Sequence, residues 1–148
     1  MPGVFLSYNR QDASDFAVLL YAWLAERFGP GHVFWDREGI RPGQEFPKEL
    51  ERQLRDCEAL IALIGPAWTP SEWITREIGS ALRRKVLVLP VLIGDRPHLE
   101  RDGLPAAIRR LASLQTLDTR DLRFRQLLME TLEGQVTSAP GEDRSATP

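Results

Sequence analysis

The stretch Ala59-Leu60-Ile61-Ala62-Leu63-Ile64, followed at once by Gly65-Pro66, is apolar throughout. A strand with one face in water alternates apolar and polar side chains, whereas a strand covered on both faces is apolar at every position. Val86–Ile93 is a second run of this kind, and both runs are far too short to cross a bilayer. We therefore predict two central strands of a sheet that is covered on both faces.

Three further β-type segments continue the same spacing around these two runs. Val4–Tyr8 and His32–Asp36 precede them, Ser113–Leu117 follows, and successive segments begin 27 or 28 residues apart. This interval fits one strand, one helix and two loops. The alternation predicts an α/β fold: a flavodoxin-like, doubly wound sheet of five parallel strands in the order 2-1-3-4-5, with helices on both faces.

Helical periodicity fills the segments between the strands. We expect Asp12 to be the N-cap of the first helix, and the capping box Thr69-Pro70-Ser71-Glu72 to open the third with proline at the first helical position. Weaker patterns predict helices over Leu104–Leu111 and Asp121–Leu132. The expected buried faces of the first two helices are Phe16, Leu19, Leu20, Trp23, Leu24 and Phe28, then Phe46, Leu50, Leu54 and Cys57.

Length and composition indicate one soluble domain. The chain has 148 residues, of which 43% are hydrophobic and 27% charged. A net charge of −2 gives no electrostatic case for a nucleic-acid or anionic-membrane partner. Cys57 is the only cysteine, which excludes an intramolecular disulfide and favours a reducing, cytoplasmic location. The polar residues 137–148 are expected to form a disordered tail or linker after a domain of residues 1–136.

Function is expected where the winding of such a sheet reverses, at the carboxyl ends of the first and third strands. The loops there, residues 7–12 and 65–72, carry neither a P-loop nor a dinucleotide-binding glycine motif. Ser7-Tyr8 and Gly65-Pro66 also lack the clustered acidic residues of a two-component receiver domain. The two histidines have no partner at ligand spacing, so we expect no metal site.

Glu77 is the candidate reactive group of the third predicted helix. It follows Trp73 by four residues, so both side chains share one helix face beside the apolar stripe that contains Ile74 and Ile78. No basic residue stands three or four positions from Glu77. This local pattern alone favours a solvated surface carboxylate and a packing role for Trp73. The alternative is a carboxylate held beside the core in a reactive site.

Val33–Gly43 combines two glycines and a proline with an isolated apolar residue, Ile40. One interpretation is a βα loop shaped only by turn chemistry. The other is a protruding contact loop, since an apolar side chain such as Ile40 has little reason to stand alone in water. The residues themselves favour neither interpretation.

Three of these segments, in this order and spacing, resemble the Toll/interleukin-1 receptor (TIR) domain family, specifically its bacterial members. Val4–Tyr8, continued to Asp12, is similar to the first box of the family, and Val33–Gly43 is similar to its BB loop. Ser71–Ile78 is similar to the segment that carries the catalytic glutamate of the family. The resemblance covers residues 4–134, and it departs from the family pattern at Gly65, where many relatives carry serine.

The resemblance implies an NAD glycohydrolase that cleaves the nicotinamide–ribose bond, with NAD as substrate and no further cofactor. It also implies self-association with other TIR domains, a fused or separate sensor domain, and a role in bacterial anti-phage defence. A non-catalytic TIR–TIR interaction module, an adaptor or scaffold, is the alternative. The implied residues are Glu77 for catalysis; Phe5, Ser7, Tyr8, Arg37 and Trp73 for substrate binding; and Asp36, Ile40, Pro42 and Gly43 for the assembly loop.

Overall fold

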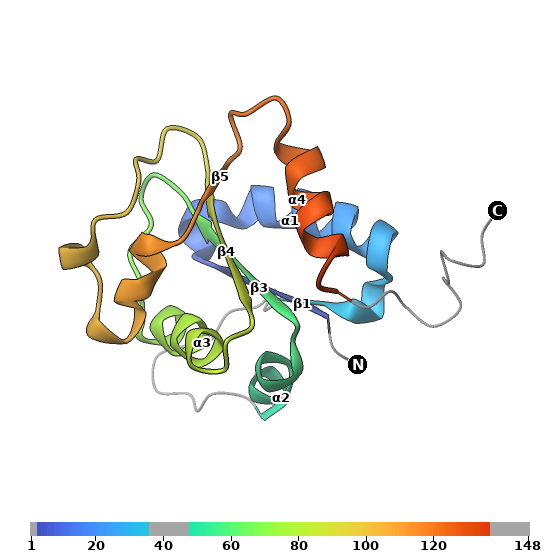
Figure 1. Cartoon of the computed structure of the whole chain (residues 1–148), viewed down its shortest axis with the longest axis horizontal. Coiled ribbons are helices and arrows are strands. Elements are labelled where there is room, and N and C mark those ends of the chain that lie inside the picture. The colour runs from blue at the N-terminus through green and yellow to red at the C-terminus, as the bar shows by residue number, and fades with distance from the viewer. Residues whose placement is uncertain (1–2, 36–47, 137–148) are drawn as a thin grey trace.

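A single parallel sheet forms the centre of the molecule (Figure 1). The computed structural model describes residues 3–35 and 48–136. The order of the strands is β2-β1-β3-β4-β5 and every neighbouring pair is parallel, which confirms the predicted topology. The strands are β1 (Val4–Tyr8), β2 (Val33–Trp35), β3 (Ala59–Ile64), β4 (Leu87–Leu92) and β5 (Leu117–Asp118).

Helices cover both faces of this sheet. Figure 1 shows α1 and α4 on one side, and α2 and α3 on the other. Within the described residues, three short 3₁₀ helices accompany them, and η3 contacts α3. The bounds are α1 (Arg10–Phe28), α2 (Lys48–Asp56), α3 (Glu72–Arg83), α4 (Phe124–Glu133), η1 (Pro30–His32), η2 (Arg101–Gly103) and η3 (Ala106–Ser113).

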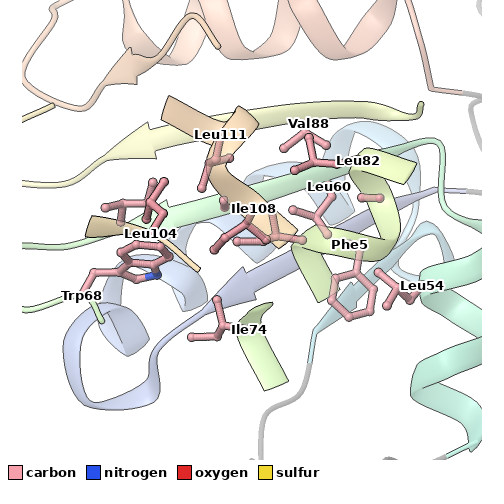
Figure 2. Close-up of a cluster of buried hydrophobic side chains, with 14 of the residues drawn as sticks. Phe5, Leu54, Leu60, Trp68, Ile74, Leu82, Val88, Leu104, Ile108 and Leu111 are labelled. Carbon is pink, nitrogen blue, oxygen red and sulfur yellow. The ribbon is translucent and has the colours of Figure 1, made fainter. Parts of the chain in front are cut away.

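The sheet separates two hydrophobic cores. All six residues of β3 are buried, as expected for a strand covered on both faces. Because side chains alternate along a strand, Leu6 of β1 packs in the core under α1 and α4, whereas Phe5 packs in the core under α2 and α3. Figure 2 shows the second core, in which Trp68 and Ile74 lie among side chains of η3 and the sheet.

The first helix begins earlier than the sequence pattern predicted. Asn9 is its N-cap, and the Asn9 Oδ1 accepts a hydrogen bond from the Gln11 N–H at 3.0 Å. The expectation that Asp12 caps this helix is therefore wrong. Leu19 was also expected on the buried face, but it is 46% exposed. The buried positions of α1 are Ala13, Ala17, Leu20, Leu24 and Phe28.

The third helix begins later than predicted. Its N-cap is Ser71, whose Oγ accepts from the Ile74 N–H at 3.1 Å, so the expected cap Thr69 lies two residues before it. A capping hydroxyl two positions further along the chain satisfies the same orphan N–H groups. Glu72, not Pro70, consequently opens α3.

The C-terminal elements differ most from the expectations. The helix predicted over 104–111 is the 3₁₀ helix η3, which extends through Ser113 into the predicted fifth strand. The prediction of a strand over 113–117 is wrong except at Leu117, where the two-residue β5 begins. The final helix starts at Phe124 instead of Asp121, because Asp121 forms a turn in which its Oδ1 accepts from the Arg123 N–H at 2.8 Å.

Candidate active site

Ser7 and Glu77 meet at the carboxyl edge of the sheet. The Ser7 hydroxyl donates a hydrogen bond of 2.8 Å to Glu77 Oε1, and this bond joins the end of β1 to the middle of α3. Ser7 is 2% exposed and Glu77 is 7% exposed. The sheet reverses its winding between β1 and β3, so the pair lies at the end of the fold where ligands of open α/β sheets bind.

The burial of Glu77 overturns the interpretation of this residue as a solvated surface carboxylate. Ile74, Ile78 and Ala81 form the buried stripe of α3, as the periodicity predicted. Glu77 precedes Ile78 directly, and the packing of α3 on the sheet buries the Glu77 side chain as well. A buried carboxylate is costly unless it is paired or hydrogen-bonded, and the Ser7 hydroxyl supplies one such bond.

The other two candidates on β1, Phe5 and Tyr8, have different surroundings from each other. Phe5 shares the Ser7 face of the strand but is fully buried, and its ring stacks on Phe34 with centroids 5.3 Å apart. In this structure Phe5 belongs to the core and not to the wall of a cleft. Tyr8 points to the opposite face, where its ring tilts against Trp35 at 6.1 Å. The structure therefore brings Ser7 to Glu77, buries Phe5 in the core and places Tyr8 on the other face of β1.

Trp73 lies in the first turn of α3, one turn before Glu77, and is half-buried. It packs against the core that contains Phe5 and Ile74. The remaining sequence candidates, Asp36, Arg37, Ile40, Pro42 and Gly43, lie outside the described residues together with the tail of residues 137–148.

Two charged side chains fasten the loop that connects β3 to α3. Asp12 Oδ1 accepts a hydrogen bond from the Ala67 N–H at 3.1 Å. Arg96, from the segment after β4, donates to the carbonyl oxygen of Trp68 at 3.3 Å, and its guanidinium lies 5.9 Å from the centre of the Trp68 indole. The loop leading into the helix of Glu77 is thus held from two other segments of the chain.

The sequence patterns did not predict these loop contacts. The contact of Asp12 with another loop could have been suspected. A polar residue within the switch-point loop can reach backbone N–H groups of the neighbouring loop as well as those of its own helix. Arg96 carried no signal of its own, since nothing in a loop between a strand and a 3₁₀ helix specifies which carbonyl groups a guanidinium will meet.

Within residues 3–35 and 48–136, no three His, Cys, Asp or Glu side chains are grouped so that they could hold a metal ion. None of the helices in those ranges combines the length and the hydrophobicity of a membrane-spanning helix.

The strand order and the buried carboxylate define a flavodoxin-like α/β domain with a candidate site at its switch point. The family model of the TIR domain matches residues 4–128. The chain belongs to the TIR domain family, as its sequence boxes indicated.

Similar proteins agree with this assignment. A protein of Brachypodium distachyon described as "Probable 2' cyclic ADP-D-ribose synthase BdTIR" is 26% identical over 95 residues, which make up 64% of this chain and 42% of that protein. The chain thus spans about two fifths of the length of this curated relative.

Two solved structures share the fold. The TIR domains of the activated Roq1 resistosome give a TM-score of 0.65 at 17% identity, with 90% of this chain and 99% of that chain covered. The TIR domain of the Toll-related receptor TRR-2 from Hydra magnipapillata gives 0.61 at 16% identity with the same coverage. At this level of identity, the likeness describes the fold alone.

Proposed function

We propose that this TIR domain is an NAD glycohydrolase that cleaves the bond between nicotinamide and ribose, with Glu77 as the catalytic residue. One observation carries the proposal: a carboxylate that is 7% exposed and hydrogen-bonded to Ser7 lies at the switch point of the sheet. The Brachypodium relative, described as a probable synthase of a cyclic ADP-D-ribose, supports the same class of substrate.

The reaction suits a single carboxylate. When the nicotinamide–ribose bond breaks, its electron pair passes to the pyridinium ring, so nicotinamide leaves as a neutral molecule and needs no general acid. The positive charge moves to an oxocarbenium-like ribose, which an adjacent carboxylate stabilises electrostatically. Ordinary glycosidases use two carboxylates, because their leaving oxygen must receive a proton.

The acceptor then decides the product. Water that attacks the ribose carbon and releases one proton gives ADP-ribose, and a hydroxyl or ring nitrogen of the same molecule gives a cyclic ADP-ribose isomer. Because Glu77 is withdrawn from bulk water, its charge acts more strongly on the ribose cation than a solvated carboxylate would. Trp73, one turn earlier on α3, is the candidate to wall the substrate on this side.

The test is release of nicotinamide from NAD by the purified chain at high protein concentration. Glu77→Gln keeps the size of the side chain and removes its charge, so we expect the rate to fall at least ~100-fold. Glu72→Gln is the matched control, because Glu72 is an exposed glutamate in the first turn of the same helix. Its rate should equal that of the wild type.

Each other outcome has a definite meaning. Equal release by wild type and Glu77→Gln would show that the central residue has been misassigned. No release from the wild type, even when it is concentrated into oligomers, would favour the non-catalytic TIR–TIR interaction module instead. Folding of each variant is checked by its thermal unfolding transition.

We further propose that self-assembly activates this reaction and that the segment 36–43 takes part, as the resemblance to bacterial members implies. A fused or separate sensor domain would then supply the signal, in anti-phage defence. Ile40→Asp should reduce both self-association and NAD cleavage by on the order of tenfold or more, since a charge is poorly tolerated in an apolar contact. Sedimentation velocity and nicotinamide release measure the two effects.

Leu122→Asp is the control for this variant. Leu122 lies just before α4 and is fully exposed, so the same apolar-to-acidic change there tests a general effect of charge on assembly. Association and cleavage of Leu122→Asp should match the wild type. Ile40→Asp protein that assembles and cleaves NAD normally would remove the assembly role from this segment.

A further inference from the structure

Ser7 and Glu77 are 70 residues apart in sequence and are joined by a hydrogen bond between their side chains. Each residue belongs to a different rigid element. Ser7 lies opposite Ala62 of β3 on β1, which runs between β2 and β3, and the described pairing with β2 ends one residue earlier, at Leu6. Strands in this position are held by hydrogen bonds along both edges, so the Ser7 hydroxyl originates from a backbone with little freedom. Glu77 comes from the middle of the 12-residue helix α3.

The two side chains differ in their own freedom. Serine has one side-chain torsion between its backbone and its oxygen, whereas glutamate has three between its backbone and its carboxylate oxygens. A hydrogen bond from the short side chain therefore restricts the long one, and not the reverse. The bond also supplies a donor to a carboxylate that has left most of its water behind.

We propose that Ser7 is a positioning residue for Glu77, an inference that rests on the proposed NAD cleavage. Ser7 holds Oε1 in place so that the carboxylate meets the ribose in one orientation. The substrate does not touch Ser7 itself, whose hydroxyl is already directed at Glu77 and whose residue is 2% exposed. This differs from the role in substrate binding that the sequence resemblance implied for Ser7.

A positioning role predicts a loss in kcat and not in KM. Ser7→Ala removes the donor without adding volume, so NAD binds as before but meets a carboxylate with more orientations available. A hydrogen bond to a charged group corresponds to roughly a 10- to 100-fold change in rate, and we expect kcat to fall by that amount. KM should stay within about twofold of the wild type, because uniform binding is untouched.

Ser7→Cys separates hydrogen bonding from packing. A thiol is close in size to a hydroxyl but donates a weaker hydrogen bond, so kcat should fall between those of wild type and Ser7→Ala. If Ser7 only filled space, kcat would follow the thermal stability of each variant. It would not fall in the order of hydrogen-bond strength from serine through cysteine to alanine. Ser14→Ala is the control, because it removes a hydroxyl that bonds within α1, on the other face of the sheet.

The experiment compares initial rates of nicotinamide release against NAD concentration for wild type, Ser7→Ala, Ser7→Cys and Ser14→Ala. Thermal unfolding of each protein is followed alongside. Lower kcat in the order serine, cysteine, alanine at constant KM supports the inference. Should Ser7→Ala not fold, the wild-type and Ser7→Cys proteins still give the kcat and KM comparison.

Two results overturn the inference alone. One is an active wild type whose kcat is unchanged in both Ser7 variants. The other is a raised KM at unchanged kcat, which would return Ser7 to the substrate-binding residues. A wild type that releases no nicotinamide overturns the proposed function and this inference with it, so the two failures are distinguishable.

Discussion

Gly65 and Asp12 share one small volume at the carboxyl edge of the sheet. A Cβ atom on Gly65 would lie 2.4 Å from Asp12 Oδ2, far inside van der Waals contact. The family pattern frequently has serine at this position, and the structure gives a physical reason for glycine in this chain. The Asp12 carboxylate occupies the space and uses its other oxygen to hold the Ala67 N–H.

This shared volume makes the two positions interdependent. Gly65→Ser should push the Asp12 carboxylate off the Ala67 N–H and lower the free energy of unfolding by about 1–3 kcal/mol. In an Asp12→Ala background the obstacle is gone, so Gly65→Ser should then cost much less. Urea denaturation of the four proteins in this double-mutant cycle measures the coupling.

Gly103→Ala is the control for the glycine change, because nothing lies within 4 Å of a Cβ atom placed at Gly103. It should leave the unfolding free energy nearly unchanged. Strictly additive effects of Gly65→Ser and Asp12→Ala would contradict the proposed competition for space. The rate of NAD cleavage should fall together with the free energy of unfolding in this series only if the loop between β3 and α3 also orients α3.

Residue by residue, the sequence placed the candidate site more accurately than it described its contacts. Periodicity put Glu77 next to the buried stripe of α3, and strand alternation put Ser7 on one face of β1. Neither pattern contains the hydrogen bond between them, because that bond depends on how α3 packs on the sheet. The family motif did not show that Phe5 is fully buried in the core or that Tyr8 takes the opposite face of β1, because both depend on how the helices pack on the sheet.

At the scale of elements, the buried strands were predicted best and the helix ends worst. Six apolar residues in succession left β3 no other plausible environment, and its bounds agree with the structure. Helix starts depend on a choice among nearby polar side chains. Asn9 and Asp12 were both able to cap α1, and the contact of Asp12 with Ala67 belongs to tertiary structure that local sequence does not show.

Pro90 explains why β5 is shorter than the spacing suggested. Ile93 donates its N–H to the carbonyl oxygen of Ile64 in β3. Backbone groups of successive residues point to opposite neighbouring strands, so the backbone nitrogen of Pro90, three residues earlier, is on the β5 side. Proline has no N–H to give to a neighbouring strand. Pairing with β5 accordingly starts beyond it, at Val91 opposite Leu117. The chain before Leu117 forms η3 instead, and Leu111 there is fully buried in the core under α2 and α3.

At the scale of the whole molecule, α2 is attached to α3 by the ion pair between Glu51 and Arg76 and by the side chain of Arg84, as well as by apolar packing. Arg84, at the end of α3, donates to the backbone carbonyl groups of Leu54 and Arg55 at the end of α2. Cys57 lies just beyond, 6% exposed, and its Sγ–H donates to the Leu54 carbonyl at 3.2 Å. Cys57 therefore reports whether α2 stays docked.

We predict that Cys57 reacts with thiol reagents only when the whole domain unfolds. Burial raises the pKa of the Cys57 thiol, with a smaller opposing effect of Arg84, so little thiolate forms in the native state at pH 8. Labelling should be at least ~1000-fold slower than for a free thiol and should accelerate with urea, as global opening does. Arg84→Met should permit labelling through detachment of α2 alone, at a rate that urea hardly changes. If wild-type Cys57 already labels in that urea-independent way, α2 opens locally, and the domain is not one cooperative unit on the side that carries Glu77.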